Sequence, residues 1–364
     1  MDEKPPRPRI LSLSGQDIRT AAEALAAGML VAFPTETVYG LGADAFNSAA
    51  VAKVFAAKGR PAFDPLIVHI ARREHLAQVA DLAALPPAAR EKAGALCHAF
   101  WPGPLTLVLP KTPAIPRLVT SGLPTVAVRL PDHKAAQSLI SLSTGALAAP
   151  SANPFGRLSP TRAEHVLEGL GSAVDFILDG GRTSIGVEST VVALASDGSQ
   201  RILRPGGIGR ESIEEIIGPV EAASNSKAGG GVHAPGQLPS HYAPGTPLIL
   251  YTQAQMSALP YRGHEGYLFF SAASRTVWLE RRCLAPGETP LIQTLSETGS
   301  LAEAGANLFD TLHDLDKRAV SVIRAEQAPW RGLGVAINDR LSRAAAGGPL
   351  ENSAGTPLAA GSLS

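Results

Sequence analysis

The sequence predicts an α/β protein with two domains, and three observations lead to this fold class. Over roughly the first 220 residues, stretches with apolar residues at helical spacing alternate with short apolar runs of strand length. The chain has 364 residues, which is more than one hydrophobic core usually serves. Residues 221–246 are rich in Ala, Gly, Ser and Pro, a composition that favours a linker between two folded parts.

Composition and charge exclude several classes of protein. Lys plus Arg and Asp plus Glu both number 32, so the chain lacks the cationic excess of a non-specific nucleic-acid binder. No apolar run approaches the ~18 to 20 residues of a membrane helix, and the first residues lack the apolar core of a signal peptide. The two cysteines, Cys97 and Cys283, are far apart and without metal-type spacing. We therefore expect a cytoplasmic protein with no membrane partner and no metal centre of its own.

The first domain, expected over residues 12–220, contains clear helix signals. Residues 16–29 have helical periodicity behind Ser14, which is a plausible helix cap. A second helix over residues 48–57 meets Gly59, which can take the left-handed conformation that ends helices. Further helices are expected at 73–80, 87–100, 134–142, 163–170 and 211–217, and strands at 30–33, 66–70, 105–109, 125–130, 146–149, 176–178 and up to 204.

The second domain, expected over residues 247–346, has the pattern of a smaller, Rossmann-like α/β unit without a dense cluster of polar residues. Its long helix would place Leu308, Leu312 and Leu315 on one side. Strands are expected at 248–251, 267–270 and 320–323, and helices at 301–318 and 335–345. The Gly-, Ala-, Ser- and Pro-rich residues 347–364 are expected to form a disordered tail.

Residues 58–69 carry the strongest chemical signal in the chain. Lys58 supplies a compact ammonium and Arg60 a planar guanidinium at the exit of a predicted helix, a combination suited to phosphate oxygens. Cations at a helix end also complement the helix macrodipole. Spacing alone therefore leaves both interpretations open.

Polar segments near other predicted strands are further candidates for ligand contacts. In residues 34–42, glycines allow close backbone approach and Thr35 offers a hydroxyl, although a tight connection would look similar. Residues 150–161 follow a strand end, where α/β sheets usually bind ligands, but Ser159 or Thr161 could equally cap the next helix. Arg129 interrupts an apolar strand, so it meets either a salt-bridge partner or a substrate carboxylate. Trp101 is expected to anchor the core.

Eight motifs occur together and in order along the first domain. They are Phe-Pro-Thr-Glu-Thr-Val-Tyr-Gly-Leu-Gly (33–42), Lys-Gly-Arg-Pro (58–61), Pro-Leu-Ile-Val-His (65–69), Trp-Pro-Gly-Pro-Leu-Thr (101–106), Thr-Val-Ala-Val-Arg (125–129), Ala-Pro-Ser-Ala-Asn (149–153), Gly-Val-Glu-Ser-Thr (186–190) and Leu-Arg-Pro-Gly (203–206). This set resembles the L-threonylcarbamoyl-AMP synthase family, with its YrdC-like domain. Residues 235–244 and the domain after them are similar to the long form of that family.

The resemblance implies a twisted mixed sheet with a large concave cavity and one reaction. L-threonine, bicarbonate and ATP would give L-threonylcarbamoyl-AMP and pyrophosphate, the first step of N6-threonylcarbamoyladenosine modification of tRNA. Mg²⁺ would accompany the ATP, as the charge of the polyphosphate also suggests. Downstream tRNA-modification proteins would use the product, and weak binding of tRNA itself is compatible with the resemblance.

The resemblance also implies roles for individual residues. Lys58 and Arg60 would be the catalytic cations that grip the triphosphate. Residues expected to hold threonine are Thr35, His69, Arg129, Ser189 and Thr190, with Arg129 at its carboxylate. Residues expected at the nucleotide, besides the two cations, are Asp64, Thr125, Ala149, Ser151, Asn153, Ser159, Arg204, His241 and Tyr242. The linker would fold back over the active site, with Tyr242 as a lid.

Asp64 departs from the family, which usually has Asn at this position. A carboxylate there would repel phosphates unless it binds a metal or pairs with Arg60.

Two other functions fit parts of the sequence. A nucleic-acid-binding module would gather Lys58, Arg60, Arg129 and Arg204 in one groove, but the neutral charge balance argues against it. Carbamoyl-transferring maturation enzymes share the first domain but add zinc-finger modules, and no Cys-x-x-Cys pattern occurs here. The second domain could also be an interaction platform.

Overall fold

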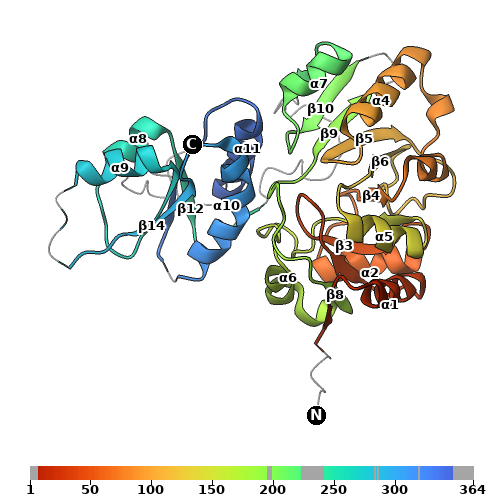
Figure 1. Ribbon diagram of the computed structural model, residues 1–364, viewed down its shortest axis with the longest axis horizontal. Helices are drawn as coiled ribbons and strands as arrows, with labels where there is room; N and C mark the ends of the chain where they lie inside the picture. Colours follow the sequence, from red (N-terminus) through yellow and green to blue (C-terminus); the bar gives the residue numbers. More distant parts are fainter. Residues whose placement is uncertain are drawn as a thin grey trace, which may run out of the picture. The chain divides into compact units, whose positions relative to one another are not determined.

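The structure, a computed structural model, describes residues 7–194, 199–222, 242–282, 284, 287–318 and 320–346. These residues divide into two compact units (Figure 1). The first unit contains residues 7–155 and 159–222, and the second contains residues 156–158 and those from 242 onward. Most of the expected linker (223–241) and the expected tail (347–364) lie outside the described residues.

The first unit is built around an eleven-stranded mixed sheet with the strand order β1-β8-β2-β3-β7-β4-β6-β5-β9-β10-β11. Its strands are β1 (Arg9–Leu11), β2 (Val31–Phe33), β3 (Gly40–Asp44), β4 (Ile67–Ile70), β5 (Leu105–Pro110), β6 (Thr125–Arg129), β7 (Ala146–Ala148), β8 (Phe176–Leu178), β9 (Thr190–Leu194), β10 (Gln200–Arg204) and β11 (Glu221–Ala222). Strand β4 pairs parallel with β6 and antiparallel with β7. The predicted mixed α/β fold is confirmed, whereas its concave cavity stays a prediction.

Helices of the first unit begin and end where local signals place them. The Ser14 side chain accepts a hydrogen bond from the Asp17 amide at 3.1 Å and caps α1, and Gly59 ends α2 with φ 61°. The helices are α1 (Gly15–Ala26), α2 (Ser48–Lys58), α3 (Leu76–Val79), α4 (Pro87–Phe100), α5 (Lys134–Leu142), α6 (Ala163–Leu170) and α7 (Arg210–Ile217), with 3₁₀ turns at Arg73–His75, Leu82–Ala84 and Gly171–Ala173.

The two faces of this sheet bury different helices. Val51 and Val54 of α2 pack in the same core cluster as Val68 and Val128, which point to one face. Helices α1 and α5 belong to a second cluster together with Phe33 and other residues of the opposite face. Because successive side chains of a strand point to opposite faces, each strand residue faces one or the other side of the sheet.

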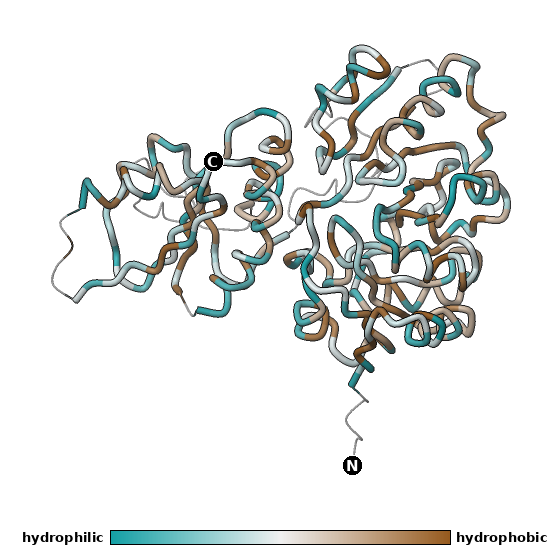
Figure 2. Tube along the Cα trace, in the orientation of Figure 1, coloured by the Kyte–Doolittle hydropathy of each residue, from teal (hydrophilic) through white to brown (hydrophobic). Residues whose placement is uncertain are grey.

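The second unit contains a four-stranded parallel sheet in the order β12-β15-β13-β14. Its strands are β12 (Leu248–Tyr251), β13 (Gly266–Ser271), β14 (Leu291–Ser296) and β15 (Ile323–Glu326), and its helices are α8 (Gln253–Ala258), α9 (Ala272–Glu280), α10 (Leu301–Asp316) and α11 (Leu333–Ala345). Hydrophobic positions recur along the strands of each unit (Figure 2). As predicted, Leu308, Leu312 and Leu315 of α10 are buried. A Rossmann-like connectivity stays a prediction.

Several predicted elements differ from the observed ones. The segment 34–42 was expected to be irregular, yet β3 begins at Gly40 and pairs with β2 and β7. A Cβ atom at Gly42 would lie 2.9 Å from the Phe33 ring, so the glycine allows this close strand pairing. Strands β9 and β14 and helices α8 and α9 were not predicted. The expected cap at Ser159 or Thr161 is wrong, because α6 begins after Arg162 without a side-chain cap.

The second unit also contains the polar cluster that its sequence did not indicate. Its last strand lies at 323–326 instead of 320–323 and includes a buried arginine, Arg324. The Arg324 Nε and Nη2 atoms donate to the Glu265 carboxylate at 2.6 and 2.8 Å, and Nη1 donates to the Tyr251 hydroxyl. These partners allow the charged Arg324 to be buried in β15, a strand that apolar periodicity alone would not predict.

Candidate active site

Three neighbouring strands present polar side chains on one face of the first sheet. In the strand register, His69 on β4 lies opposite Arg129 on β6, and Arg129 lies opposite Thr106 on β5. Paired residues point to the same face, so the three side chains lie beside one another. The intervening Val128 and Leu107 point into the main core, which fixes the strands.

Arg129 is nearly buried and its charge is paired. The Arg129 Nη2 atom lies 2.6 Å from the Oε1 atom of Glu36, and the two side chains are 4% and 7% exposed. The salt-bridge interpretation of Arg129 is therefore confirmed, and capture of a substrate carboxylate stays a prediction. Glu36 was not among the expected site residues.

Thr35 and His69 are buried beside this pair. The Thr35 hydroxyl donates to the Val38 carbonyl at 2.7 Å and accepts from the Thr37 amide at 3.1 Å, which holds the turn of the 34–39 loop. Burial, with a smaller contribution from the Arg129 charge, lowers the pKa of His69 to about 3. The His69 imidazole is therefore neutral at physiological pH and can accept one hydrogen bond while donating another.

We expect His69 to weaken the protein in acid. Its folded pKa lies below the unfolded value near 6.5, so the unfolded chain takes up a proton that the native state refuses. This loss begins as the pH falls below about 6.5 and continues towards pH 3, with a slope of up to about 1.4 kcal/mol per pH unit. Urea unfolding of His69→Gln between pH 7 and 4 should show a shallower decline, whereas the exposed His98→Gln control should match the unmodified protein. Equal slopes for all three proteins would contradict the assignment.

Lys58 and Arg60 are buried at the end of α2. The Lys58 Nζ atom donates to the Ser151 carbonyl at 2.7 Å and to the Asn153 carbonyl, so α2 is tied to the 151–153 segment. Burial, and next the neighbouring Arg60 charge, lowers the pKa of Lys58. The Arg60 Nε and Nη2 atoms donate to the carbonyls of Asp64 and Pro65 at 3.0 and 2.8 Å. The two cations are thus held in place by main-chain oxygens.

Asp64 has a charged partner in the structure, while its contact with a nucleotide stays a prediction. Its Oδ2 atom lies 2.9 Å from Arg60 Nη2, and the carboxylate is fully buried. Burial raises the pKa of Asp64, and the charges of Arg60, Lys58 and Arg204 act in the opposite direction. Asp64 therefore pairs with Arg60, one of the two arrangements that the sequence allowed.

A chain of hydrogen bonds connects the Arg204 region to the Arg129 face. The Arg204 Nη2 atom donates to the Ser189 carbonyl at 3.0 Å and to the Ser189 hydroxyl at 3.1 Å. That hydroxyl lies 2.7 Å from the Thr106 Oγ1 atom, and Thr106 is the register neighbour of Arg129. The charge of Arg204 also acts on the buried Asp64, the ion-pair partner of Arg60, so Arg204 lies within electrostatic range of the 58–65 loop.

Other expected site residues make hydrogen bonds to main-chain groups or to another side chain of the protein. The Thr190 hydroxyl donates to the Ile208 carbonyl at 2.7 Å and accepts from its amide at 2.9 Å. The Ser159 hydroxyl donates to the Glu188 carboxylate, and the Ala149 amide donates to the Ile67 carbonyl at 2.9 Å. Both hydroxyls are already engaged in holding neighbouring loops.

For three further expected nucleotide contacts, the contact with the nucleotide stays a prediction. Thr125 begins β6, the strand that Arg129 ends. His241 lies outside the described residues. Tyr242 belongs to the second unit, where its ring lies 5.7 Å from the Phe309 ring and 5.0 Å from the Arg340 guanidinium carbon. Its role as a lid stays a prediction.

Matches to known proteins cover most of the chain. Residues 23–206 match a family described as "Telomere recombination", and residues 208–346 match one described as "Threonylcarbamoyl-AMP synthase, C-terminal domain". A Pyrococcus abyssi threonylcarbamoyl-AMP synthase is 43% identical over 329 residues, which cover 90% of this chain and 93% of that protein. The chain belongs to the threonylcarbamoyl-AMP synthase family.

Further members of the threonylcarbamoyl-AMP synthase family match along most of the chain. The Bacillus subtilis threonylcarbamoyl-AMP synthase is 42% identical over 341 residues, 93% of this chain and 95% of that protein. A crystal structure of P. abyssi Sua5 complexed with L-threonine is similar with a TM-score of 0.79 at 38% identity, covering 92% of this chain and 97% of that one.

Sequence reasoning about this family member missed acidic residues and one hydroxyl. Glu36 and Glu188 stand inside motifs that the sequence analysis used, but neither was assigned a role there. Thr106 is the last residue of another such motif. The usable signal was membership of these motifs, and Glu36 and Glu188 also stand next to expected site residues, Thr35 and Ser189.

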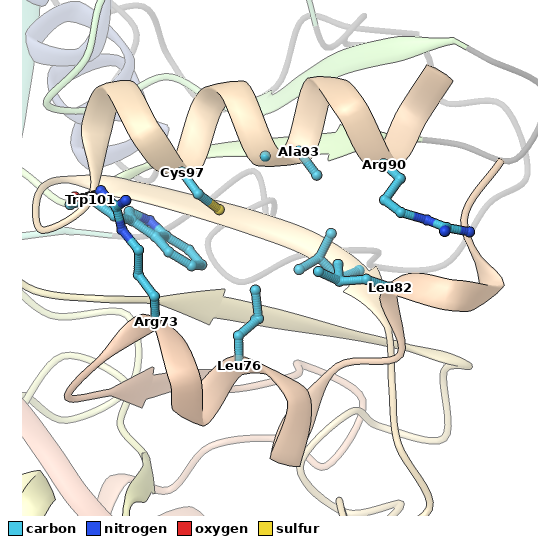
Figure 3. A pocket seen from close by; sticks show the side chains of 9 residues that line it. Arg73, Leu76, Leu82, Arg90, Ala93, Cys97 and Trp101 are labelled. Carbon is cyan, nitrogen blue, oxygen red and sulfur yellow. Dashed lines mark hydrogen bonds between the residues drawn. The ribbon is translucent and has the colours of Figure 1, made fainter. Parts of the chain in front are cut away.

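A pocket of about 340 Å³ lies elsewhere in the first unit and is lined by Arg73, Leu76, Leu82, Arg90, Ala93, Gly94, Cys97, Trp101 and Leu109 (Figure 3). Leu109 points to the face of β5 opposite Thr106, so this pocket is separate from the polar region. Burial raises the pKa of the Cys97 thiol to about 12. The Trp101 indole is buried and donates to the Leu105 carbonyl at 2.8 Å, which confirms Trp101 as a core anchor.

Among the residues that the structure describes, no three His, Cys, Asp or Glu side chains lie together as metal ligands. Within the described ranges, no helix combines the length and apolarity needed to cross a bilayer.

Proposed function

We propose that this chain makes L-threonylcarbamoyl-AMP from L-threonine, bicarbonate and ATP and releases pyrophosphate. The observation that carries this proposal is the buried polar region in which Arg129 lies opposite Thr106 in the strand register, and the Thr106 hydroxyl is joined through Ser189 to Arg204. Such a region can hold a carboxylate at one end and phosphates at the other. The high identity to synthases over most of the chain supports the same reaction.

L-threonine would bind on the Arg129 side. The guanidinium is the natural partner of the amino-acid carboxylate, because charge-assisted hydrogen bonds to carboxylates are strong and directional. Neutral His69 and the Thr35 and Ser189 hydroxyls would contribute polar contacts. Thr190 would support this side indirectly, since its hydroxyl holds the main chain at Ile208.

ATP would bind on the side of Lys58, Arg60 and Arg204. Burial lowers the pKa of Lys58. An incoming triphosphate would act in the opposite direction, because its negative charge favours the charged ammonium and forms an ion pair with it. The Ser151, Asn153 and Ser159 segment would complete the nucleotide site. The described side chains do not build a metal site of their own, so Mg²⁺ would arrive bound to the triphosphate oxygens.

The proposed reaction depends mainly on how the protein positions its substrates. The threonine amine would react with bicarbonate to give a carbamate, and a carbamate oxygen would attack the α-phosphorus in line and expel pyrophosphate. Negative charge spreads over the phosphoryl oxygens in such a transition state. Lys58 and Arg60, already fixed by main-chain carbonyls, would stabilise that charge without reorganising.

The product would supply downstream proteins that complete the N6-threonylcarbamoyladenosine modification of tRNA in the cytoplasm. Direct use of this region as a nucleic-acid groove is disfavoured, because Lys58, Arg60, Arg129 and Arg204 are each at least 92% buried. A backbone-binding groove would expose its cations to the phosphates.

Isotope tracing tests the proposed function. Purified protein would be incubated with threonine, ATP and labelled bicarbonate, and the products separated. We expect a labelled adenylate that forms only when threonine is present, together with an equal amount of pyrophosphate. Label in the adenylate without threonine, or no labelled adenylate at all, would contradict the proposal.

A further inference from the structure

Glu36 is the buried carboxylate beside Arg129, and its main chain is fixed. The Glu36 carbonyl accepts hydrogen bonds from the Ile185 amide at 2.8 Å and from the Ser184 hydroxyl at 3.3 Å. The side chain is only 7% exposed. These contacts hold the main chain of Glu36, and the ion pair with Arg129 holds its carboxylate.

The pair formed by Glu36 and Arg129 leaves hydrogen-bonding capacity unused. Their closest atoms are 2.6 Å apart, but within the described residues neither oxygen of Glu36 makes an aligned hydrogen bond. The Nε and Nη2 atoms of Arg129 also lack hydrogen-bond partners there. Buried polar atoms without partners are costly, so this pair is better suited to a polar ligand than to a purely structural role.

We propose that Glu36 and Arg129 form a clamp for an α-amino acid zwitterion, in which Arg129 binds the carboxylate and Glu36 binds the ammonium and takes its proton. The inference rests on the proposed function, which supplies threonine as the substrate. An α-amino acid carries its positive and negative groups on one carbon. A guanidinium and a carboxylate that lie side by side are the matching arrangement of opposite charges.

Transfer of this proton has a chemical purpose. A protonated amine has no lone pair and cannot attack carbon. Glu36 accepts one proton from the ammonium, and the freed lone pair forms the N–C bond with bicarbonate carbon. Water leaves with the bicarbonate hydroxyl and a second amine proton, which gives the carbamate. The proton on Glu36 then passes to solvent, so the step releases one proton overall.

Two histidines lie around the pair formed by Glu36 and Arg129. His133, the N-cap residue of α5, interacts electrostatically with Glu36, and burial lowers the pKa of His133. His69 lies beside Arg129 and is neutral at physiological pH. Arg129 is the permanently charged cation that pairs with Glu36. A bound threonine ammonium would supply a second positive charge to the carboxylate.

Calorimetry with two ligands tests the clamp. The ligands are L-threonine and 3-hydroxybutanoate, which is threonine without its amino group, both in the absence of ATP and bicarbonate. In Glu36→Gln we expect threonine to bind about 10- to 100-fold more weakly. Binding of 3-hydroxybutanoate should be unchanged or tighter, because Arg129 is released from its internal partner. Glu23→Gln, an exposed position on α1, serves as the matched control and should change neither affinity.

The outcomes separate this inference from the proposed function. An equal loss of both ligands in Glu36→Gln, or no loss of threonine, would overturn the clamp. An unmodified protein that binds no threonine would instead contradict the proposed function. Glu36→Asp keeps the charge on a shorter side chain and covers the case in which Glu36→Gln folds poorly. It should weaken threonine binding to an intermediate extent, and an unchanged ratio between the two ligands would again overturn the clamp.

Discussion

Replacing Lys58 with Ala is expected to reduce threonine-dependent pyrophosphate release by about 10²-fold or more. The Lys58 ammonium is buried and oriented by the carbonyls of Ser151 and Asn153, so it can meet developing charge on phosphoryl oxygens without rearrangement. An alanine removes both the charge and the connection to the 151–153 segment. Steady-state rates at saturating threonine and ATP would measure the effect.

The control for this prediction lies on the same helix. Lys53 is exposed and donates to a single main-chain carbonyl, that of Gly28, at 2.7 Å. Lys53→Ala should keep the full rate, and thermal unfolding should show that both variants fold. Full pyrophosphate release by folded Lys58→Ala would remove Lys58 from the catalytic machinery.

Replacing Arg129 with Ala is expected to weaken threonine binding by about 10²-fold and to destabilise the protein by roughly 3 to 5 kcal/mol. The two effects have one cause, because the guanidinium partners Glu36 in the structure and would partner the carboxylate of the substrate. Without it, Glu36 stays buried with no opposite charge. Calorimetry with threonine and urea unfolding measure the two effects separately.

A double variant distinguishes the two consequences of losing Arg129. In Arg129→Ala combined with Glu36→Gln, the unpaired charge is gone, so much of the lost stability should return. Threonine binding should not return, because no cation is left for the carboxylate. If Arg129→Ala alone binds threonine as tightly as the unmodified protein does, Arg129 is a structural residue.

Elements with strong local signals could be predicted closely from the sequence. Helix α4 over Pro87–Phe100 and helix α5 over Lys134–Leu142 have the predicted bounds, because helical periodicity and terminal residues are local properties. Strands β3 and β9 could not be predicted in this way. Gly40 to Asp44 contains two glycines, and its strand conformation depends on pairing with β2 and β7.

Some residues of the candidate site could also be predicted from the sequence, and others could not. Lys58, Arg60 and Arg204 could be named as candidates because each stands inside a motif that carries the family resemblance. Glu36 was not identified, since a glutamate inside a threonine-rich loop has no special meaning until its partner is known. The pairing of Asp64 with Arg60 was one of two options and needed the fold of the 60–65 loop to decide.

By itself, the sequence determined the family, the mixed α/β class and which cations belong to the first unit. These follow from residue order and from periodicities that act within one turn or one strand. Only the tertiary structure decided that Arg129 meets Glu36 and that Thr106 links Ser189 to the Arg129 face. Strand order and register bring together residues more than eighty positions apart, and burial then makes each unpaired charge costly enough to require a partner.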